Sequence, residues 1–347
     1  MEKEHLYGVI MAGGRGERFW PAGRRKRPKQ MLRLLGGGTM IEETCQRLFP
    51  LIAPERLLVI TNRDYVEAIR ALLPIPAENV IGEPEGRNTA PCVALAAALV
   101  SRRDPGATMV ILPADHVIRP AKIFQDTLYA AAEAAQGGML VTLGITPTYP
   151  ATGYGYIELG EAVQGGFNRA ASFREKPDRE TAEAFFISGS YRWNSGIFVW
   201  RCDAIIGEFA EFVPDLCRRL KNWAAGADYT RDFAECESIS IDCAVMEKSR
   251  KVLVGCAPFY WNDIGSWSAL HSVLPADAEG NVTGGRFLTL SAAGNVLMND
   301  DAETLIGVIG IRDTAVIKSG NAVLICPLAE EQRVRELVRM IDDEKFV

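Results

Sequence analysis

The chain has 347 residues, of which 48% are hydrophobic and 24% are charged, a balance that excludes a disordered or low-complexity protein. Its formal net charge of −6 argues against a general nucleic-acid binder, because such proteins are usually basic. The longest uncharged apolar run, residues 92–100, is too short for a bilayer, which needs ~20 residues, and no signal peptide opens the chain. We therefore expect a cytoplasmic protein with neither nucleic-acid nor membrane partners.

The first half of the chain alternates short apolar runs with longer helical patterns. Runs rich in Val and Ile predict strands that are buried on both faces, at residues 7–11, 57–61, 109–112 and 139–143. Helices are predicted between these runs, at residues 40–49, 64–73, 89–103 and 123–136. This alternation predicts an α/β fold with a Rossmann-like, doubly wound and mostly parallel sheet.

The rest of the chain has a less regular middle and a distinct C-terminal part. Helices are predicted at residues 179–188 and 204–223, among segments rich in aromatic residues, Gly and Asn that indicate strands and loops around a pocket. A polar, Gly-rich stretch at 275–285 then marks a boundary. We predict a catalytic domain over residues 1–275 and a small β unit with a terminal helix over 276–347.

Short strands separated by Gly, Asn and Asp turns build the predicted β unit, at residues 286–290, 295–298, 304–309, 315–317 and 322–326. The pattern is compatible with a left-handed β-helix, although it has no strict repeat period. The last helix, predicted over 329–342, carries an apolar stripe that includes Val334, Leu337 and Ile341. We expect this stripe to pack against the β unit.

A glycine-rich loop follows the first predicted strand, with Ala12, Gly13, Gly14 and Gly16 leading to Arg18. Such a turn lets backbone N–H groups approach phosphates, although the glycines alone also fit a plain tight turn. The dinucleotide fingerprint fails because a phenylalanine replaces its third glycine, and the Walker A pattern fails because no Gly-Lys-Ser/Thr follows. The loop therefore indicates a phosphate site of another kind.

The loop continues into a longer motif, G-x-G-x-R-F-W-P-x6-P-K, which contains Arg18 and ends at Lys29. This motif resembles the signature of the nucleoside-diphosphate-sugar pyrophosphorylases, and its FWP and PKQM segments resemble the mannose-1-phosphate guanylyltransferase branch. The resemblance extends in family order from residue 7 to about residue 338. It implies that the loop binds the nucleotide and that Arg18 and Lys29 are catalytic cations, which suits two anionic substrates that repel each other. The other basic residues, between Arg24 and Arg33, fit a solvated face.

Two aspartates are candidate metal ligands. Asp115 follows a predicted strand at the sheet edge where parallel α/β sheets bind ligands, and Asp263 lies far along the chain in apolar surroundings. From the residues alone, the stronger explanation is structural, with Asp115 as a helix cap and Asp263 as a turn former. The resemblance implies that both bind Mg²⁺, which takes carboxylates together with substrate phosphates, with Mn²⁺ or Co²⁺ as alternatives. We interpret His116 as a structural neighbour.

The sugar-phosphate site is expected in the middle of the chain. Glu175 and Lys176 resemble the family's glutamate-lysine-proline motif, in which the carboxylate binds sugar hydroxyls and the ammonium binds phosphate. Gly155 and Asn194 match family segments that line the same pocket. Surface Glu-Lys pairs are common, so this assignment depends on the resemblance.

The base site is expected in the segment that precedes the helix predicted at 89–103. By resemblance, Glu83, Pro84, Asn88 and Thr89 bind the nucleotide, with acceptors for the donors of guanine. Asn88 is also a good N-cap for that helix, which is the simpler explanation of its position.

The predicted reaction joins GTP and mannose 1-phosphate to give GDP-mannose and pyrophosphate, by in-line attack on the α-phosphorus. No general base is required, because the second pKa of a phosphate monoester is ~6. The alternatives are the same chemistry with another nucleotide or sugar and a catalytically silent subunit that binds GDP-mannose. The chain ends at Val347, so we expect no phosphomannose isomerase activity. By resemblance, the β unit supports a homodimer.

Overall fold

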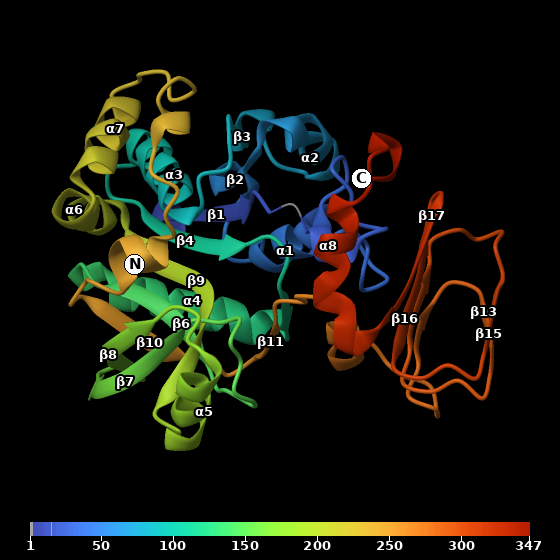
Figure 1. Cartoon of the computed structure of the whole chain (residues 1–347). Helices are drawn as coiled ribbons and strands as arrows, with labels where there is room; N and C mark the ends of the chain where they lie inside the picture. Colours follow the sequence, from blue (N-terminus) through green and yellow to red (C-terminus); the bar gives the residue numbers. More distant parts are fainter. Residues whose placement is uncertain (1–2, 15) are drawn as a thin grey trace. The chain divides into compact units, whose positions relative to one another are not determined.

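The computed structural model describes residues 3–14 and 16–347 of the chain, shown in Figure 1. Arg15 of the predicted phosphate loop lies outside the described residues. The chain folds into two compact units that are each assembled from separate segments. The sheet unit comprises Met1–Gly13, Cys45–Pro113 and Ile118–Trp261, and the coil unit comprises Gly14–Thr44, Ala114–Val117 and Asn262–Val347. The division predicted at residue 275 remains a proposal.

A nine-stranded sheet with the order β3-β2-β1-β4-β9-β6-β10-β8-β7 forms the centre of the sheet unit (Figure 1). Its strands are β1 (Leu6–Ala12), β2 (Leu57–Asn62), β3 (Val80–Glu83), β4 (Thr108–Pro113), β6 (Leu140–Ile145), β7 (Tyr156–Val163), β8 (Phe167–Arg174), β9 (Tyr191–Arg201) and β10 (Val252–Cys256). The pairs β3–β2, β2–β1, β1–β4 and β6–β10 are parallel. The predicted α/β fold is confirmed, and the antiparallel pairing of β7, β8 and β9 adds to it.

Helices cover both faces of this sheet. The helices of the sheet unit are α2 (Val66–Leu72), α3 (Thr89–Arg103), α4 (Ala121–Ala134), α5 (Arg179–Ser188), α6 (Cys202–Phe212) and α7 (Pro214–Ala224). Helix α3 is buried along most of its length and shares one apolar core with α6, α7 and strands β1, β2, β4 and β9. The core residues of α4 are not part of that cluster, although α4 contacts β4, β6 and β9, so it lies on the opposite face.

One helix expected over residues 204–223 is two helices in the structure. Helix α6 ends at Phe212, and Pro214 opens α7 at its first turn. Proline is favoured there because it has no N–H to leave unpaired, whereas inside a helix it would remove a hydrogen bond. The single predicted helix was therefore wrong at Val213, whose φ of −141° is not helical.

The coil unit contains a stack of short parallel strands. The structure places β12 (Val282–Gly284), β14 (Val296–Asn299) and β16 (Thr314–Ser319) side by side, with β17 (Ala322–Pro327) antiparallel to β16, and pairs β13 (Phe287–Leu290) with β15 (Ile306–Ile309). Asn281 and Asn295 connect successive coils, because the Oδ1 of Asn281 accepts hydrogen bonds from the backbone N (3.1 Å) and Nδ2 (2.9 Å) of Asn295. The predicted β-helix-like unit is thus confirmed.

The remaining elements are short. Helix α1 (Met40–Leu48) follows the glycine-rich loop and the 3₁₀ helices after it. Strand β5 (Val117–Arg119) pairs with β11 (Tyr260–Asn262). Helix α8 (Val334–Arg339) is shorter than the predicted 329–342, because a 3₁₀ helix precedes it, in which the Glu331 carboxylate accepts hydrogen bonds from Ser266 and Ser268. Leu337, predicted to be core, is 42% exposed. Among the described residues, no helix combines the length and apolar character needed to cross a membrane.

Candidate functional site

A cavity of about 410 Å³ lies beside the glycine-rich loop, within the coil unit. We call it the phosphate pocket, and it is lined by Gly14, Gly16, Glu17, Arg18, Phe19, Lys29, Asp115, His116, Asp263, Gly265 and Arg335. The structure therefore brings together six of the residues singled out in the sequence, namely Gly14, Gly16, Arg18, Lys29, Asp115 and Asp263. They come from three separate segments of the chain.

Lys29 is the most constrained charged residue of the phosphate pocket. It is 7% exposed, and its ammonium lies 2.8 Å from the Asp115 carboxylate and 2.5 Å from the backbone carbonyl of Asp263. The ring of Phe19 lies 5.6 Å from the same nitrogen, within range of a cation–π contact. A buried lysine held by these groups presents a positive charge at a fixed place.

The backbone around Lys29 requires glycine at position 16. Gly16 has φ of 65°, and a Cβ at this residue would lie 2.5 Å from the Cβ of Lys29. Glycine alone avoids both the left-handed strain and the collision. Across the same pocket, the guanidinium of Arg18 donates to the carbonyl of Gly265 at 2.8 Å. The glycine-rich loop therefore packs directly against Lys29, and its own Arg18 is held by the carbonyl of Gly265.

The segment that carries Asp263 is also constrained. Ile264 has φ of 40°, which is an outlier for a β-branched residue, and its N–H donates to the Asn262 side chain at 2.7 Å. A strained backbone of this kind persists only where the surrounding packing holds it in place. Such residues cluster at functional sites. Ile264 itself is fully buried in the core of the coil unit, which fixes the turn.

Asp115 is ionised in this environment. Burial alone would raise the pKa of its carboxyl, but the charges of Lys29 and His116 and the hydrogen bond from Lys29 hold the pKa below its ordinary value. The pocket thus places an ionised carboxylate directly beside the ammonium of Lys29. Arg335, which also lines the pocket, was missed by the sequence analysis, because the helix pattern around it marks only the apolar side of α8.

Two carboxylates in one pocket are compatible with a divalent cation. Asp115 and Asp263 both line the phosphate pocket and both contact Lys29, the first through its carboxylate and the second through its carbonyl. The structure places no group of three or more His, Cys, Asp or Glu residues where they could hold a metal, within the residues that it describes. An ion bound here would therefore need further ligands from a substrate or from water.

The predicted base site lies in the sheet unit, where β1 and β3 end. The Glu83 side chain is 5% exposed, and an added Cβ on Gly13 would lie 3.2 Å from its Oε2 atom. Burial raises the pKa of Glu83 to about 7, against a smaller opposing effect of its hydrogen bond with Cys92. Its Oε1 atom has no hydrogen-bond partner among the described residues, which leaves an acceptor available. Ala12 accepts from Thr61 at 2.9 Å, which fixes the end of β1.

The rest of the predicted base segment has structural roles. Asn88, with φ of 64°, caps α3 through its side chain, which accepts from the backbone N–H of Thr89 at 2.9 Å. The hydroxyl of Thr89 accepts from the N–H of Ile241 at 2.8 Å, and Pro84 follows β3 directly. The N-cap explanation of Asn88 is thus confirmed, and a nucleotide contact remains a prediction.

The predicted sugar residues form a second group in the sheet unit, which we call the sugar cluster: Gly155, Glu175, Lys176, Asn194 and Asp242. A Cβ on Gly155 would lie 2.6 Å from Oε2 of Glu175, and the backbone carbonyl of Gly155 accepts from the N–H of Asn194 at 2.8 Å. Lys176 pairs with Glu175 at 2.9 Å and has φ of 42°. The structure therefore brings all four predicted residues together.

Asp242 belongs to this cluster and was missed by the sequence analysis. Its Oδ1 accepts from the Asn194 amide at 2.9 Å, and it opens a π-helical turn, a feature frequent at functional sites. Burial, followed by the nearby Glu175 charge, raises its pKa to about 7, against smaller lowering effects that include Lys176 and Asn194. No sequence motif links Asp242 to the other residues of the sugar cluster, at 155–194, because the fold alone brings these distant segments together.

Comparison with known families divides the chain in two. The family model of the nucleotidyl transferases matches residues 7–280, and that of the MannoseP isomerase/GMP-like beta-helix domain matches residues 285–341. The first match contains every residue of the phosphate pocket except Arg335, as well as the whole sugar cluster.

Individual proteins match over nearly the whole chain. A mannose-1-phosphate guanylyltransferase from Klebsiella pneumoniae is 40% identical over 351 residues, which cover 97% of this chain and 74% of that protein. A mannose-1-phosphate guanylyltransferase from Escherichia coli gives the same identity and coverage. A crystal structure from Thermus thermophilus, described as a mannose-1-phosphate geranyltransferase, has 34% identity and a TM-score of 0.90, covering 98% of this chain and 100% of that chain.

Proposed function

The chain belongs to the nucleotidyl transferase family, and from this premise we propose that it is a mannose-1-phosphate guanylyltransferase. The reaction joins GTP and mannose 1-phosphate into GDP-mannose and releases pyrophosphate. The mannose 1-phosphate oxygen attacks the α-phosphorus of GTP in line, and the bond from that phosphorus to the pyrophosphate oxygen breaks. No proton transfer is required, because the phosphate monoester is already largely dianionic at neutral pH.

The observation that carries this proposal is the position of Lys29. Its buried ammonium is fixed by Asp115 and by the carbonyl of Asp263, so it needs no reorganisation when an anion arrives. Preorganised positive charge of this kind stabilises the negative charge that develops during phosphoryl transfer. Arg18, tied to the carbonyl of Gly265, adds a second cation, and the N–H groups of the glycine-rich loop add dipoles.

Asp115 and Asp263 would hold a divalent metal ion in the phosphate pocket, and we propose Mg²⁺ because the available donors are hard oxygens. The ion would supply charge neutralisation along the triphosphate. Mn²⁺ and Co²⁺ remain alternatives. The lowered pKa of Asp115 supports this role, since its carboxylate stays ionised over the whole neutral range.

Within the sheet unit, we assign the sugar cluster to mannose 1-phosphate. Glu175 and Asp242 offer carboxyl oxygens to sugar hydroxyls, Asn194 orients Asp242, and the exposed ammonium of Lys176 suits the phosphate. We assign Glu83 to the guanine base, because its buried carboxyl has a free oxygen to accept a hydrogen bond. Ala12, Gly13, Pro84, Asn88 and Thr89 would complete the nucleotide site.

The activity is tested by pyrophosphate release with Mg²⁺, using GTP, dTTP, UTP or ATP, each with mannose 1-phosphate or glucose 1-phosphate. We expect turnover with GTP and mannose 1-phosphate above all other pairs. Preference for another pair would keep the chemistry and overturn the assigned specificity. A folded protein that binds nucleotide without any turnover would instead identify a silent GDP-mannose-binding subunit.

The role of Glu83 is tested by the Glu83→Gln variant in the same assay. An amide replaces one acceptor oxygen with a donor, so we expect the preference for GTP over ATP to fall by ~10- to 100-fold, as when a buried hydrogen bond to substrate is mismatched. Unchanged preference in a folded variant would remove Glu83 from the base site.

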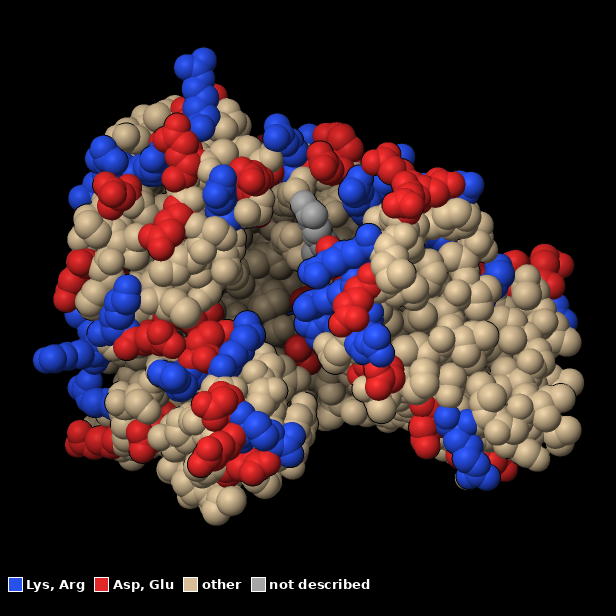
Figure 2. Space-filling view, in the orientation of Figure 1, with Lys and Arg blue, Asp and Glu red and all other residues tan. Residues whose placement is uncertain are grey.

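We also infer a cytoplasmic homodimer. None of the eight cysteines forms a disulfide in the part of the chain that the structure describes, as is usual in a reducing compartment. Figure 2 shows a surface with few charges over β13, β15 and β17, and large apolar residues such as Leu288 (67% exposed) and Ile309 (72% exposed) lie on these strands. Exposed apolar patches of this kind mark interaction sites. Sedimentation equilibrium should give a dimer for the natural chain and a monomer for Ile309→Lys, and a monomeric natural chain would contradict the inference.

A further inference from the structure

The phosphate pocket holds as many carboxylates as basic side chains among its described lining residues. The lysine and arginine residues are Arg18, Lys29 and Arg335, and the carboxylates are Glu17, Asp115 and Asp263. Lys29 is already paired with Asp115, and Arg18 donates to the carbonyl of Gly265. A nucleoside triphosphate is a polyanion, so its binding calls for a cation whose donors are not yet committed to the protein.

Arg335 meets this requirement. Its side chain is exposed and forms no hydrogen bond or ion pair with any residue that the structure describes. The five N–H groups of a guanidinium lie in one plane and can donate two parallel hydrogen bonds to phosphate oxygens. Arg335 therefore adds an uncommitted donor group to a pocket whose other described cations are engaged.

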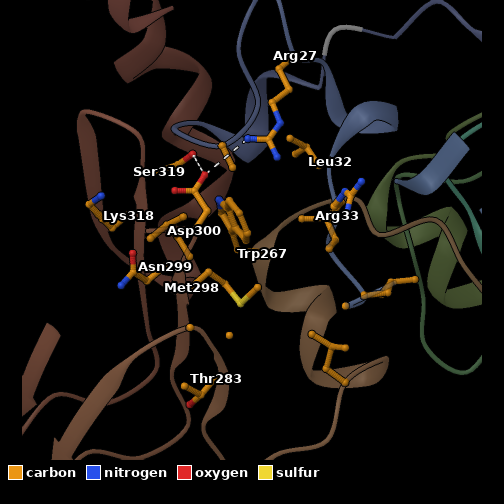
Figure 3. Close-up of a pocket in the computed structure, with 18 of the residues that line it drawn as sticks. Arg27, Leu32, Arg33, Trp267, Thr283, Met298, Asn299, Asp300, Lys318 and Ser319 are labelled. Carbon is orange, nitrogen blue, oxygen red and sulfur yellow. Dashed lines mark hydrogen bonds and ion pairs between the residues drawn. The ribbon is translucent and has the colours of Figure 1, made fainter. Parts of the chain in front are cut away.

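The arginines that follow the glycine-rich loop in the sequence do not fill this role. Arg24 donates to three backbone carbonyls and to a side-chain amide, and Arg25 pairs with a glutamate near the C-terminus. Figure 3 shows Arg27 directed at Asp300, 3.6 Å away, and Arg33 beside a separate cavity. The lining of that cavity shares no described residue with the phosphate pocket.

The segment that precedes Arg335 is fastened to the pocket by a buried carboxylate. Glu331, which is 8% exposed, accepts hydrogen bonds from the Ser266 hydroxyl at 2.7 Å and from the N–H of Ser268 at 2.8 Å. These serines follow directly on Gly265, which lines the pocket. The start of α8 is thus tied to the segment that carries the second aspartate.

The segment that follows Arg335 is fastened to the glycine-rich loop. Helix α8 packs against the 3₁₀ helix Glu17–Phe19, and beyond α8 the carbonyl of Phe346 accepts from the indole N–H of Trp20 at 2.7 Å. Both ends of the segment are therefore held. The backbone of Arg335 is fixed beside the pocket, whereas its exposed side chain can turn toward a ligand.

We propose that Arg335 is a further phosphate-binding residue, which binds the β- and γ-phosphates of the nucleotide and holds pyrophosphate as it leaves. This inference rests on the proposed function. When the bond from the α-phosphorus to the bridging oxygen breaks, that oxygen keeps the electron pair, and negative charge grows on the pyrophosphate. A guanidinium at this place stabilises that charge.

The β- and γ-phosphates fit Arg335 better than the phosphate of mannose 1-phosphate does. Arg335 shares its pocket with the glycine-rich loop, which we assign to the nucleotide, whereas the exposed ammonium of Lys176 is assigned to the sugar phosphate. The β- and γ-phosphates also carry most of the charge of a triphosphate, and they become the leaving group.

Binding is tested by calorimetry on the full chain with Mg²⁺ and, separately, GTP, GMP and inorganic pyrophosphate. We expect Arg335→Ala to weaken binding of GTP and pyrophosphate by at least ~10-fold, equivalent to ~1.4 kcal/mol. Binding of GMP should not change, because GMP has no β- or γ-phosphate. Arg335→Lys should recover part of the loss, since it keeps the charge but not the planar pair of donors.

The matched control is Arg339→Ala, which removes an exposed arginine of the same helix that does not line the phosphate pocket. It should bind all three ligands as the natural chain does. Thermal unfolding should give the same midpoint for Arg335→Ala and the natural chain, because the Arg335 side chain has no partner among the described residues.

The role in the reaction is read from the reverse direction, in which pyrophosphate and GDP-mannose give GTP. Arg335→Ala should raise the KM for pyrophosphate at least ~10-fold and leave the KM for GDP-mannose within twofold. An equal rise in both constants would indicate a structural role and overturn the proposal.

Two results in calorimetry would also overturn the proposal: unchanged binding of GTP and pyrophosphate by Arg335→Ala, or an equal loss for GTP and GMP. A natural chain that binds pyrophosphate but not GTP would contradict the assigned guanine specificity alone, and the pyrophosphate comparison would then decide the role of Arg335. A natural chain that binds neither ligand would overturn the inference together with the proposed function.

Discussion

The phosphate pocket and the sugar cluster each contain a lysine paired with a carboxylate, but the two pairs differ in their surroundings. Lys29 lies 2.8 Å from Asp115 with its side chain 8% exposed, whereas Lys176 lies 2.9 Å from Glu175 with its side chain 62% exposed. Exposed pairs contribute ~0–1 kcal/mol, because water screens them and the side chains lose entropy. At nearly equal contact distances, the charge of Lys29 is therefore fixed, whereas the charge of Lys176 can move.

This difference assigns the two regions different tasks. A charge held before the substrate arrives can stabilise the transition state, since it requires no reorganisation during the reaction. A solvated charge beside carboxyl and amide groups is better suited to recognise the substrate itself, where directional hydrogen bonds select hydroxyl groups. The following predictions test this division, and they run from the largest expected effect to the smallest.

Removal of the fixed charge should have the largest effect. We expect Lys29→Ala to lower kcat/KM by ~10²–10³-fold, as when one preorganised electrostatic group is lost from an active site. Steady-state pyrophosphate release measures this loss. Thermal unfolding should show a lower midpoint as well, because Asp115 loses its ion-pair partner.

The matched control for Lys29→Ala is Lys26→Ala, which removes an exposed lysine of the same segment. It should keep the activity and stability of the natural chain. Full activity of Lys29→Ala, or an equal loss in Lys26→Ala, would contradict the fixed-charge interpretation of the phosphate pocket.

Displacement of the fixed charge should have the next largest effect. In Gly16→Ala the new Cβ meets the Lys29 Cβ at 2.5 Å in a backbone with φ of 65°, so the lysine segment must shift. A misplacement of ~1 Å can cost ~10²-fold in rate, and we expect a loss of that order in kcat. Gly207→Ala, where no atom lies within 4 Å of the new Cβ, is the control and should remain fully active.

The sugar cluster should respond in KM more than in kcat. We expect Asp242→Ala to raise the KM for mannose 1-phosphate by ~10-fold, with little change in kcat or in the KM for GTP, because a hydrogen-bonding group on the substrate is left unpaired. Asp242→Asn should recover part of the affinity, since an amide oxygen still accepts from Asn194. An equal fall in kcat for both variants would place Asp242 in the chemical step instead.

The pH dependence of stability should give the smallest signal. The pKa of Asp242 is raised to about 7 in the folded chain by burial and by Glu175, so the folded state keeps this proton at pH values where the unfolded state has lost it. The free energy of unfolding contributed by Asp242 should therefore fall as pH rises from ~4 to ~7.

Urea unfolding of the natural chain and Asp242→Asn at several pH values across this window measures that contribution. The variant should lose less stability than the natural chain as pH rises. Glu83 also has a raised pKa and contributes with the same sign in both proteins, so the difference between the two curves isolates Asp242. Parallel curves would show that the pKa of Asp242 is not raised in the folded chain.

Much of the fold was predictable from the sequence because its longer helices have clear ends. Helices α3 (Thr89–Arg103) and α5 (Arg179–Ser188) match their predicted residues, and each has a capping side chain, Asn88 and Asp178, directly before it. The resemblance to the guanylyltransferase branch is confirmed by relatives that are 40% identical over 97% of the chain.

The short strands could not be predicted with the same success. Strands β3, β5, β10 and β12 have between three and five residues, too few to show a period, and the sheet supplies the hydrogen bonds that define them. Asp242 and Arg335 were missed for a related reason. Each reaches its site through packing between segments distant in the chain, which leaves no local pattern.

The division of the chain into interleaved segments limits how this protein can be rearranged by genetic exchange. The coil unit takes its pieces from residues 14–44, 114–117 and 262–347, so a single crossover between two related genes cannot transfer it whole. An exchange near residue 262 would combine Asp263 from one parent with Lys29 and Asp115 from the other. Hybrid enzymes should therefore be functional only where both parents shape the phosphate pocket alike.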